Sequence, residues 1–395
     1  TKFRVPGLNF IIKDSTATDN YVLTVDSNGE AGWEAAAGGG ASDINGLSDA
    51  ITNSSGETIG LGTGALANDD GSGNDNTALG YQAGNDITTG NNNVTIGYQA
   101  GDKLTTGLKN IAIGTQAMHT NGTTHDGVIA IGHQAMESAG PTNSFVAIGQ
   151  NAARYNTPGS SAVFIGFSAA TYAPTGSSNV AIGYEAMYGV NGSPITEYGN
   201  VAIGRGAMYA AKNAAIGNTA LGAYTLDLVN GGDYNTAVGY DSGDSITTGS
   251  NNTVIGNGAD ASSATVSNEF TLGNSSISSL RCQVQTISSL SDRRDKKDIE
   301  ELPLGIDFIN TLKPVKFTWN MRDGAKVGEQ EAGFIAQDLD EAQIDADAED
   351  YLSLVLKNNP DKLEASYGKL VPVLVKAVQE LSAEVATLKK EIENG

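Results

Sequence analysis

The chain has 395 residues, of which 50 are glycine, and its formal net charge is −22. This acidic balance argues against a nucleic-acid partner, because proteins that bind phosphate backbones present a positive surface. The longest apolar run, at 371–378, is interrupted by Pro372 and Lys376. It is far shorter than the roughly 20 residues that span a bilayer, so no membrane insertion is expected.

Residues 1–56 are predicted to be an N-terminal attachment and linker segment. Two strand-like pieces, at 3–14 and 21–42, are joined by turn residues such as Ser-Asn-Gly. The second piece ends in a run of glycine and alanine that is typical of a linker. Because the chain starts at Thr1 without an apolar signal region, we expect it to be a piece of a longer protein.

A repeated motif decides the architecture of residues 57–275. Its unit is apolar-x-apolar-Gly-x-x-Ala/Ser, as in VAIGQNA and VAIGYEA. Successive repeat glycines lie 17 or 18 residues apart, except in three steps between Gly183 and Gly239 that sum to 56 and indicate insertions. The repeat glycines are Gly62, Gly80, Gly97, Gly114, Gly132, Gly149, Gly166, Gly183, Gly204, Gly217, Gly239, Gly256 and Gly273.

Each repeat is predicted to form one short strand and one tight turn. The apolar residues alternate with period two, which indicates a strand with one face in a core. Glycine suits a turn with positive φ, and the small residue three positions later fits an inner corner. One unit cannot bury its apolar face alone, so the units are expected to stack into a parallel β-roll or β-helix with two or three inward aliphatic residues per coil.

The repeats resemble the head repeats of trimeric adhesins and of many phage fibres, in which three chains form interleaved rolls. This resemblance implies a homotrimer. We therefore expect 57–275 to be a trimeric shaft whose thin core is shielded by packing several chains around one axis.

Individual side chains of the shaft are assigned structural roles. His133 follows a repeat glycine, and His119 and His125 lie in a polar loop without cysteine or carboxylate at metal-binding spacing, so we expect neither metal nor cofactor. The slot after the glycine often holds tyrosine, and packing between chains is preferred to sugar stacking for this exposed ladder. The tyrosines of that slot are Tyr81, Tyr98, Tyr184 and Tyr240.

Residues 276–290 are predicted to be a narrow stalk strand, because apolar and polar residues alternate there. The only cysteine, Cys282, cannot form an intrachain disulfide and is expected to be a buried structural thiol. The candidate core positions of this strand are Ile277, Leu280, Cys282, Val284 and Ile287.

Composition changes at Ser291, where glycine becomes scarce and helical periodicity begins, so a new domain is predicted over 291–395. Its blocks are SDRRDKKDIEEL, LKPVKFTWN, AGFIAQDLDE and SYGKLVPVLVKAVQEL. Residues 371–393 carry apolar residues at alternating spacings of three and four, which predicts a coiled coil. By itself this pattern slightly favours dimers, but the repeats and their resemblance favour three chains.

The order of these blocks resembles the C-terminal intramolecular chaperone of endosialidase-type tail spikes, a self-cleaving serine peptidase family. In that family the pattern S-D-x-R-x-K supplies a nucleophilic serine and a lysine base, and the cut falls directly before the serine. The resemblance implies that Ser291 is the nucleophile, Lys296 the base, and the bond between Leu290 and Ser291 the cleavage site. Asp292 and Arg294 match the motif as well, whereas Asp295 replaces a frequent leucine.

The chemistry places demands on geometry. Lysine in water has a pKa of about 10.4 and must lose its proton to serve as a base near neutral pH. A five-residue offset rotates by about 140° on an α-helix, so Ser291 and Lys296 require either a turn between them or a lysine from a neighbouring subunit. In an isolated Ser-x4-Lys pattern, Ser291 or Asp292 would more often be the cap of a surface helix. The other blocks of the pattern favour the self-cleaving family instead.

The predicted fold class is mainly β: a β-roll or β-helix homotrimer followed by a small α+β chaperone domain that ends in a coiled-coil helix. We predict a phage tail fibre or spike, assembled in the host cytoplasm and located in the virion, that cleaves itself once as a Ser-Lys peptidase. The expected partners are a host-surface receptor or glycan and other tail proteins. The alternatives are a trimeric surface adhesin, or a spike that degrades polysaccharide with paired carboxylates.

Overall fold

The computed structural model describes residues 21–25, 31–35, 50–53, 57–72, 74–119, 124–140, 142–155, 159–172, 176–189, 198–212, 215–283, 287–322, 324 and 326–394. It divides into two compact units, Thr1–Ser144 and Phe145–Gly395. In the N-terminal segment, β1 (Tyr21–Val25) pairs antiparallel with β2 (Ala31–Ala35). The expected strand-like piece at 3–14 lies outside the described residues.

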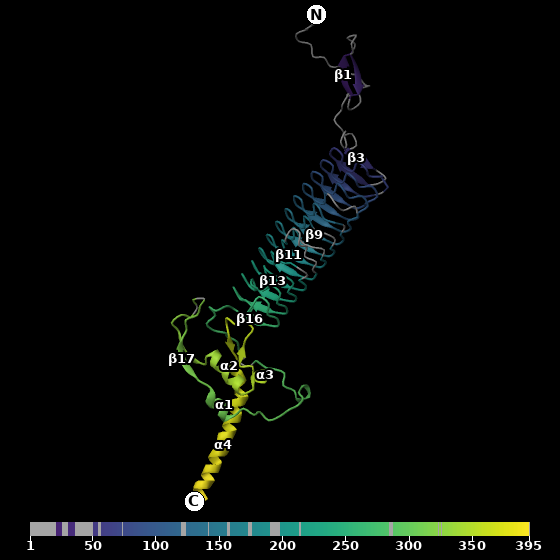
Figure 1. Ribbon diagram of the computed structural model, residues 1–395. Coiled ribbons are helices and arrows are strands. Elements are labelled where there is room, and N and C mark those ends of the chain that lie inside the picture. The colour runs from purple at the N-terminus through teal and green to yellow at the C-terminus, as the bar shows by residue number, and fades with distance from the viewer. Residues whose placement is uncertain are drawn as a thin grey trace. The chain divides into compact units, whose positions relative to one another are not determined.

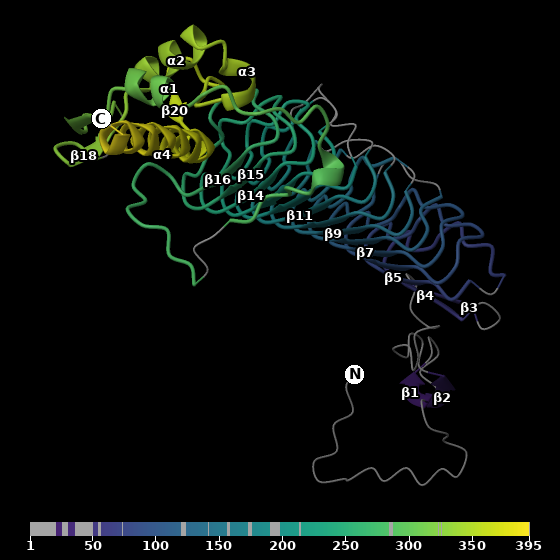
Figure 2. The same ribbon diagram turned by 90° about the horizontal axis from the view of Figure 1, so that it is seen from below.

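Within each unit, the repeats form a sheet in which each coil adds one parallel strand beside the previous one. β3 (Ala50–Asn53) is its antiparallel edge, paired with β4 (Thr58–Leu61). Figures 1 and 2 show the arrows of successive strands side by side within each unit, from β3 to β8 in the first and from β9 to β16 in the second. The other strands are β5 (Thr77–Leu79), β6 (Val94–Ile96), β7 (Ile111–Ile113), β8 (Ile129–Ile131), β9 (Val146–Ile148), β10 (Val163–Ile165), β11 (Val180–Ile182), β12 (Val201–Ile203), β13 (Thr219–Leu221), β14 (Thr236–Val238), β15 (Thr253–Ile255) and β16 (Phe270–Leu272). The predicted parallel solenoid is confirmed.

The strands present their larger aliphatic side chains outward, so the predicted inward aliphatic residues are present in the coils but lie mostly outside the strands. In most coils the middle residue is buried and its two neighbours are partly exposed, as in β9, where Ala147 is fully buried. The middle position holds alanine in most coils, and larger buried side chains such as Ile87, Leu104 and Leu226 come from the turns. The outer face therefore keeps apolar residues in contact with solvent, among them Ile59, Leu79, Leu221 and Ile255.

The repeat glycines are required by a close approach between coils. Gly166 has a φ of 138°, and a Cβ added there would lie 2.2 Å from the carbonyl oxygen of Gly183 in the next coil. Both facts exclude an L side chain, because positive φ is unfavourable for residues with a Cβ. The small residue three positions later, such as Ala169, is fully buried, which confirms the predicted inner corner.

Buried asparagines form ladders inside the coils, a feature that the sequence analysis missed. The side-chain oxygen of Asn235 accepts the backbone N–H of Asn252 at 3.0 Å, and its amide donates to the carbonyl of Gly249 at 2.8 Å. These bonds satisfy backbone groups that the turns leave buried. The asparagines in this slot are Asn76, Asn93 and Asn110 in the first unit and Asn179, Asn200, Asn218, Asn235 and Asn252 in the second.

The prediction of Gly217 as a repeat glycine is wrong. The strand of that coil is β13, which is followed by Gly222 with a φ of 141°, not by Gly217. The steps from Gly204 to Gly222 and from Gly222 to Gly239 are then 18 and 17 residues, so these coils contain no insertion. Only the step of 21 residues from Gly183 to Gly204 remains longer than the rest.

The predicted stalk strand over 276–290 is absent from the described residues of that segment, 276–283 and 287–290. Leu280 is 73 % exposed and Ile287 97 % exposed, and Cys282 is exposed as well, so the predictions of a core there and of a buried thiol are wrong for this chain. Val284 lies outside the described residues. A strand needs a neighbouring strand to bond with, and none of the described segments supplies one here.

The C-terminal region is a small α+β fold with its own core. Its elements are η2 (Arg293–Asp295), α1 (Ile306–Thr311), β17 (Val315–Thr318), β18 (Gln330–Gly333), α2 (Ala336–Asp345), α3 (Glu349–Leu352), β19 (Val355–Leu356), β20 (Glu364–Ala365), η3 (Tyr367–Lys369) and α4 (Leu370–Asn394). Phe308, Leu339 and Val373 are central in the core. Glu380 of α4 accepts the backbone N–H of Ile306 at 2.8 Å and so joins α4 to the start of α1.

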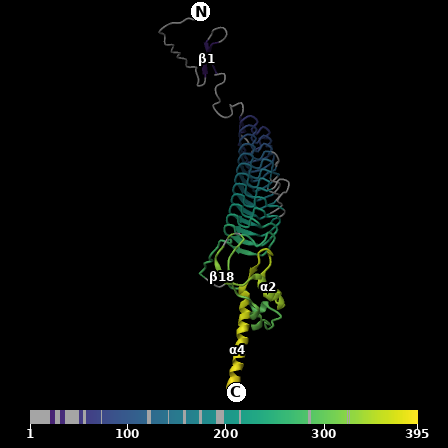
Figure 3. The same cartoon turned by 60° about the vertical axis from the view of Figure 1, so that its left-hand side comes forward.

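Helix α4 is a single helix of 25 residues that covers the segment predicted as a coiled coil. Its first turns pack on the core through Leu370, Val373 and Ala377. Figure 3 shows the remainder projecting past α2 and β18 to the C-terminus. The residues of the predicted heptad seam are exposed: Val371, Leu374, Val378, Leu381, Val385, Leu388 and Ile392. Within the described residues, no helix is long and apolar enough to cross a membrane.

Candidate active site at the start of the C-terminal region

The two residues predicted to cut the chain lie in contact. The Nζ atom of Lys296 is 2.7 Å from the Oγ atom of Ser291, which is hydrogen-bonding distance. Both residues are exposed, and Leu290 before them is 83 % exposed, so the peptide bond ahead of Ser291 lies on an open surface of the chain.

A tight turn makes this contact possible within one chain. Residues Arg293–Asp295 form the short 3₁₀ helix η2, and the residues on both sides of it, Asp292 and Lys296, have extended backbones. The chain therefore reverses direction between Ser291 and Lys296, and no continuous α-helix separates them. Of the two geometries left open by the sequence, the described chain adopts the turn.

The remaining motif residues hold the turn together. The carboxylate of Asp292 accepts the backbone N–H of Arg294 at 2.9 Å. The same carboxylate forms a fork with the Arg294 guanidinium, at 3.1 Å to Nε and 2.6 Å to the terminal nitrogen. The Arg294 side chain, and then its backbone N–H, hold the pKa of Asp292 below its usual range.

Two later blocks of the predicted pattern also meet. The backbone N–H of Phe334 donates to the hydroxyl of Tyr367 at 3.1 Å. A Cβ at Gly333 would lie 2.9 Å from the same hydroxyl, so glycine is needed for this contact. Residues 33 positions apart in the sequence thus pack as one unit, as the block order suggested.

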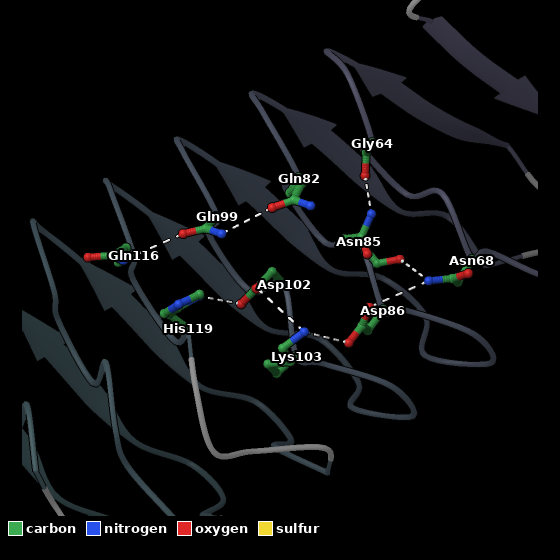
Figure 4. A network of polar contacts seen from close by, with 10 residues as sticks. All are labelled: Gly64, Asn68, Gln82, Asn85, Asp86, Gln99, Asp102, Lys103, Gln116 and His119. Carbon is green, nitrogen blue, oxygen red and sulfur yellow. Dashed lines mark hydrogen bonds and ion pairs between the residues drawn. The ribbon is translucent and has the colours of Figure 1, made fainter.

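In the shaft, the structure places a carboxylate beside a histidine that the sequence left without a partner. His119 Nδ1 lies 2.6 Å from Asp102 of the preceding coil, and Lys103 bonds to Asp86 at 2.9 Å (Figure 4). Burial raises the pKa of Asp102, and the neighbouring His119 opposes that rise. A spacing of 17 residues hid this contact from a search for local motifs. Among the described residues, no three His, Cys, Asp or Glu side chains gather in a metal-binding group.

The exposed aromatic ladder predicted for the shaft is present in the described chain. Tyr81 and Tyr98 are each about half exposed and stack with ring centroids 5.4 Å apart. Tyr184 stacks on Phe167 at 5.2 Å, and Tyr240 packs edge-on against Tyr224.

Comparisons with known proteins support the C-terminal assignment. Residues 291–348 match the model of the family Peptidase_S74, chaperone of endosialidase, and the match begins at Ser291. No curated protein and no solved structure matched the chain. The resemblance predicted for this region is therefore confirmed.

The fold and the family match together define the class of protein. A β-solenoid shaft followed by a chaperone-of-endosialidase domain makes the chain tail-spike-like. The family match also implies a self-cleaving intramolecular chaperone.

Proposed function

We propose that this chain is the distal part of a phage tail fibre or spike, and that its C-terminal domain releases itself by cutting the bond between Leu290 and Ser291. The observation that carries the proposal is the 2.7 Å contact between Lys296 Nζ and Ser291 Oγ at the first residue of the family match. A serine needs an adjacent base to become a nucleophile, and a lysine amine can serve once it has lost its proton.

The proposed reaction proceeds in two steps. Ser291 Oγ gives its proton to the Lys296 amine and bonds to the carbonyl carbon of Leu290. The carbon–nitrogen bond to Ser291 then breaks, its nitrogen takes a proton from Lys296, and an ester joins Leu290 to the serine oxygen. Water hydrolyses this ester, which leaves a carboxylate at Leu290 and restores the hydroxyl of Ser291, now the first residue of the released domain.

The proposed assembly is a homotrimer. Three surfaces would be covered by copies of the same chain: the partly exposed apolar face of the shaft sheet, the exposed apolar residues of 276–290 such as Leu280 and Ile287, and the apolar seam of α4. Such extended apolar surfaces are unusual on a monomer in water. Sedimentation of the intact chain tests this stoichiometry, and Leu381→Glu together with Leu388→Glu should reduce association because two charges would enter the seam of α4.

The chaperone domain would act on the slow step of folding. Parallel pairing between chains must begin in the correct register, and pairing that is not local in sequence is slow. By gathering three chains before the shaft forms, the domain would set that register. Its removal after cleavage would leave the shaft without a nucleus for refolding, and therefore behind a high unfolding barrier.

A mass measurement of the purified product tests the proposed cut. The expected products are residues 1–290 and a fragment of 105 residues. Ser291→Ala and Lys296→Met should both remain uncut, because each removes one partner of the contact. Ser289→Ala and Lys297→Met, which lie outside the contact, are the matched controls and should cleave normally. A Ser291→Ala chain that is still cut at the same bond would disprove the assignment.

The mature shaft is proposed to lie in the virion, joined to other tail proteins, and to attach to a receptor or glycan on the host surface. The family match supports a place in a tail spike. Binding of the cleaved shaft to whole host cells, compared with cells stripped of surface polysaccharide, tests attachment. Release of short sugars in the same incubation would instead favour a polysaccharide-degrading spike.

A further inference from the structure

The carboxylate next in sequence to the proposed nucleophile is held by an arginine. Asp292 follows Ser291 directly, and Arg294 supplies its partners through one backbone N–H and two guanidinium nitrogens. The other charged residues of the turn and its flanks are Arg293, Asp295, Lys297 and Asp298, and Lys297 lies 3.8 Å from Asp298. Of the ion pairs between described residues, none includes Lys296, whose Nζ contacts Ser291 Oγ.

This arrangement matters because a base must be uncharged to accept a proton. A carboxylate beside a lysine favours the charged ammonium and so opposes its action as a base. Asp292 is close enough in sequence to take that role if its oxygens were free. The Arg294 fork satisfies those oxygens with a permanent cation, since arginine does not lose its proton in proteins.

We propose that Arg294 is a positioning residue for the self-cleavage. It holds the Asp292 carboxylate in the turn and away from Lys296. The inference rests on the proposed function, because it concerns the same reaction. Arg294 touches neither of the reacting groups, so it acts through Asp292. The backbone N–H of Arg294 also donates a hydrogen bond to the Asp292 carboxylate, and this bond keeps the turn of η2 closed.

The test compares cleavage rates during refolding over a series of pH values. Arg294→Met removes the cation but keeps a side chain of similar length. Cleavage near neutral pH should slow by about tenfold, and the whole rate profile should move to higher pH by about one unit, since the freed carboxylate favours the lysine ammonium. The double variant Asp292→Asn/Arg294→Met should return the profile to the wild-type position. Asparagine removes the charge and can still cap the turn.

Two controls separate this role from simple support of the fold. Arg293→Met, which is the neighbouring arginine outside the fork, should leave the pH profile unchanged. Arg294→Lys keeps a cation that can pair with Asp292, so its rate should fall without a shift of the profile. Native electrophoresis of the same samples reports whether each variant assembles.

The outcomes are distinct. An equal loss of rate at every pH in Arg294→Met, without recovery in the double variant, would overturn the proposal. Recovery of assembly by the double variant, where Arg294→Met fails to assemble, would assign Arg294 to folding and overturn it as well. Failure of the unmodified chain to cleave at any pH would instead refute the proposed self-cleavage itself.

Discussion

Replacing Asn235 by alanine tests whether the asparagine ladder stabilises the shaft. The substitution leaves the backbone N–H of Asn252 and the carbonyl of Gly249 without the partners that they now have at 3.0 Å and 2.8 Å. Both residues are buried, and an unsatisfied buried polar group costs about 1–3 kcal/mol, so the loss should be about 2–6 kcal/mol. Hydrogen exchange is the suitable assay, because it reports local opening even where global unfolding is irreversible.

The smallest value in this range already gives a clear signal. A loss of about 2 kcal/mol corresponds to roughly 30-fold faster exchange of the Asn252 amide. Asn257→Ala is the matched control, because Asn257 lies in the next coil but is exposed, and its effect should stay within about 0.5 kcal/mol. Equal exchange in the two variants would show that the ladder fills space without stabilising the coils.

Two further predictions concern single residues of the shaft. Gly166→Ala should lower the free energy of unfolding by about 3 kcal/mol or more and prevent stacking of the coils, which is measured as loss of soluble shaft. Gly199→Ala has no atom within 4 Å of its new Cβ, so its positive φ should lower the free energy of unfolding by only about 1 kcal/mol. Burial lowers the pKa of His125, so shaft stability should be complete above about pH 6.5 and decline as the pH falls below it. Melting curves of His125→Asn should lose this pH dependence. Melting curves of His133→Asn, which changes an exposed histidine, should keep it.

The stacking of coils could be predicted because its causes are local. Each coil repeats the same glycine, whose positive φ and contact with the next coil tolerate no side chain. The prediction of Gly217 is wrong because AAIG and TALG both fit the motif, with glycines only five residues apart. The constant period distinguishes them, since only Gly222 keeps the steps at 18 and 17 residues.

The direction of the strand faces could not be predicted from alternation alone. Alternation with a period of two shows that the two faces of a strand differ, but it does not show which face the chain's own coil encloses. The signal lay outside the strand: asparagine four residues before the repeat glycine shares its face with the central alanine. Asn235 and Ala237 are both fully buried, whereas Thr236 between them is not.

The residues of the candidate site could be predicted from the sequence, but the geometry that joins them could not. The motif S-D-x-R-x-K was sufficient to select Ser291 and Lys296, and the spacing excluded a continuous helix between them. The 3₁₀ turn could not be read from the sequence, because several aspartates and basic residues compete for partners there. The structure assigns Asp292 to Arg294 and leaves Lys296 beside Ser291.

The distribution of apolar surface argues for an order of assembly. The core around Phe308 and Leu339 is complete within one chain, so the C-terminal region can fold on its own contacts. The seam of α4 and the outer face of the shaft sheet are exposed or partly exposed among the described residues. If α4 associates first, it fixes neighbouring chains at one end. The coils can then close one after another, because each pairs with a segment only 17 or 18 residues away through most of the shaft.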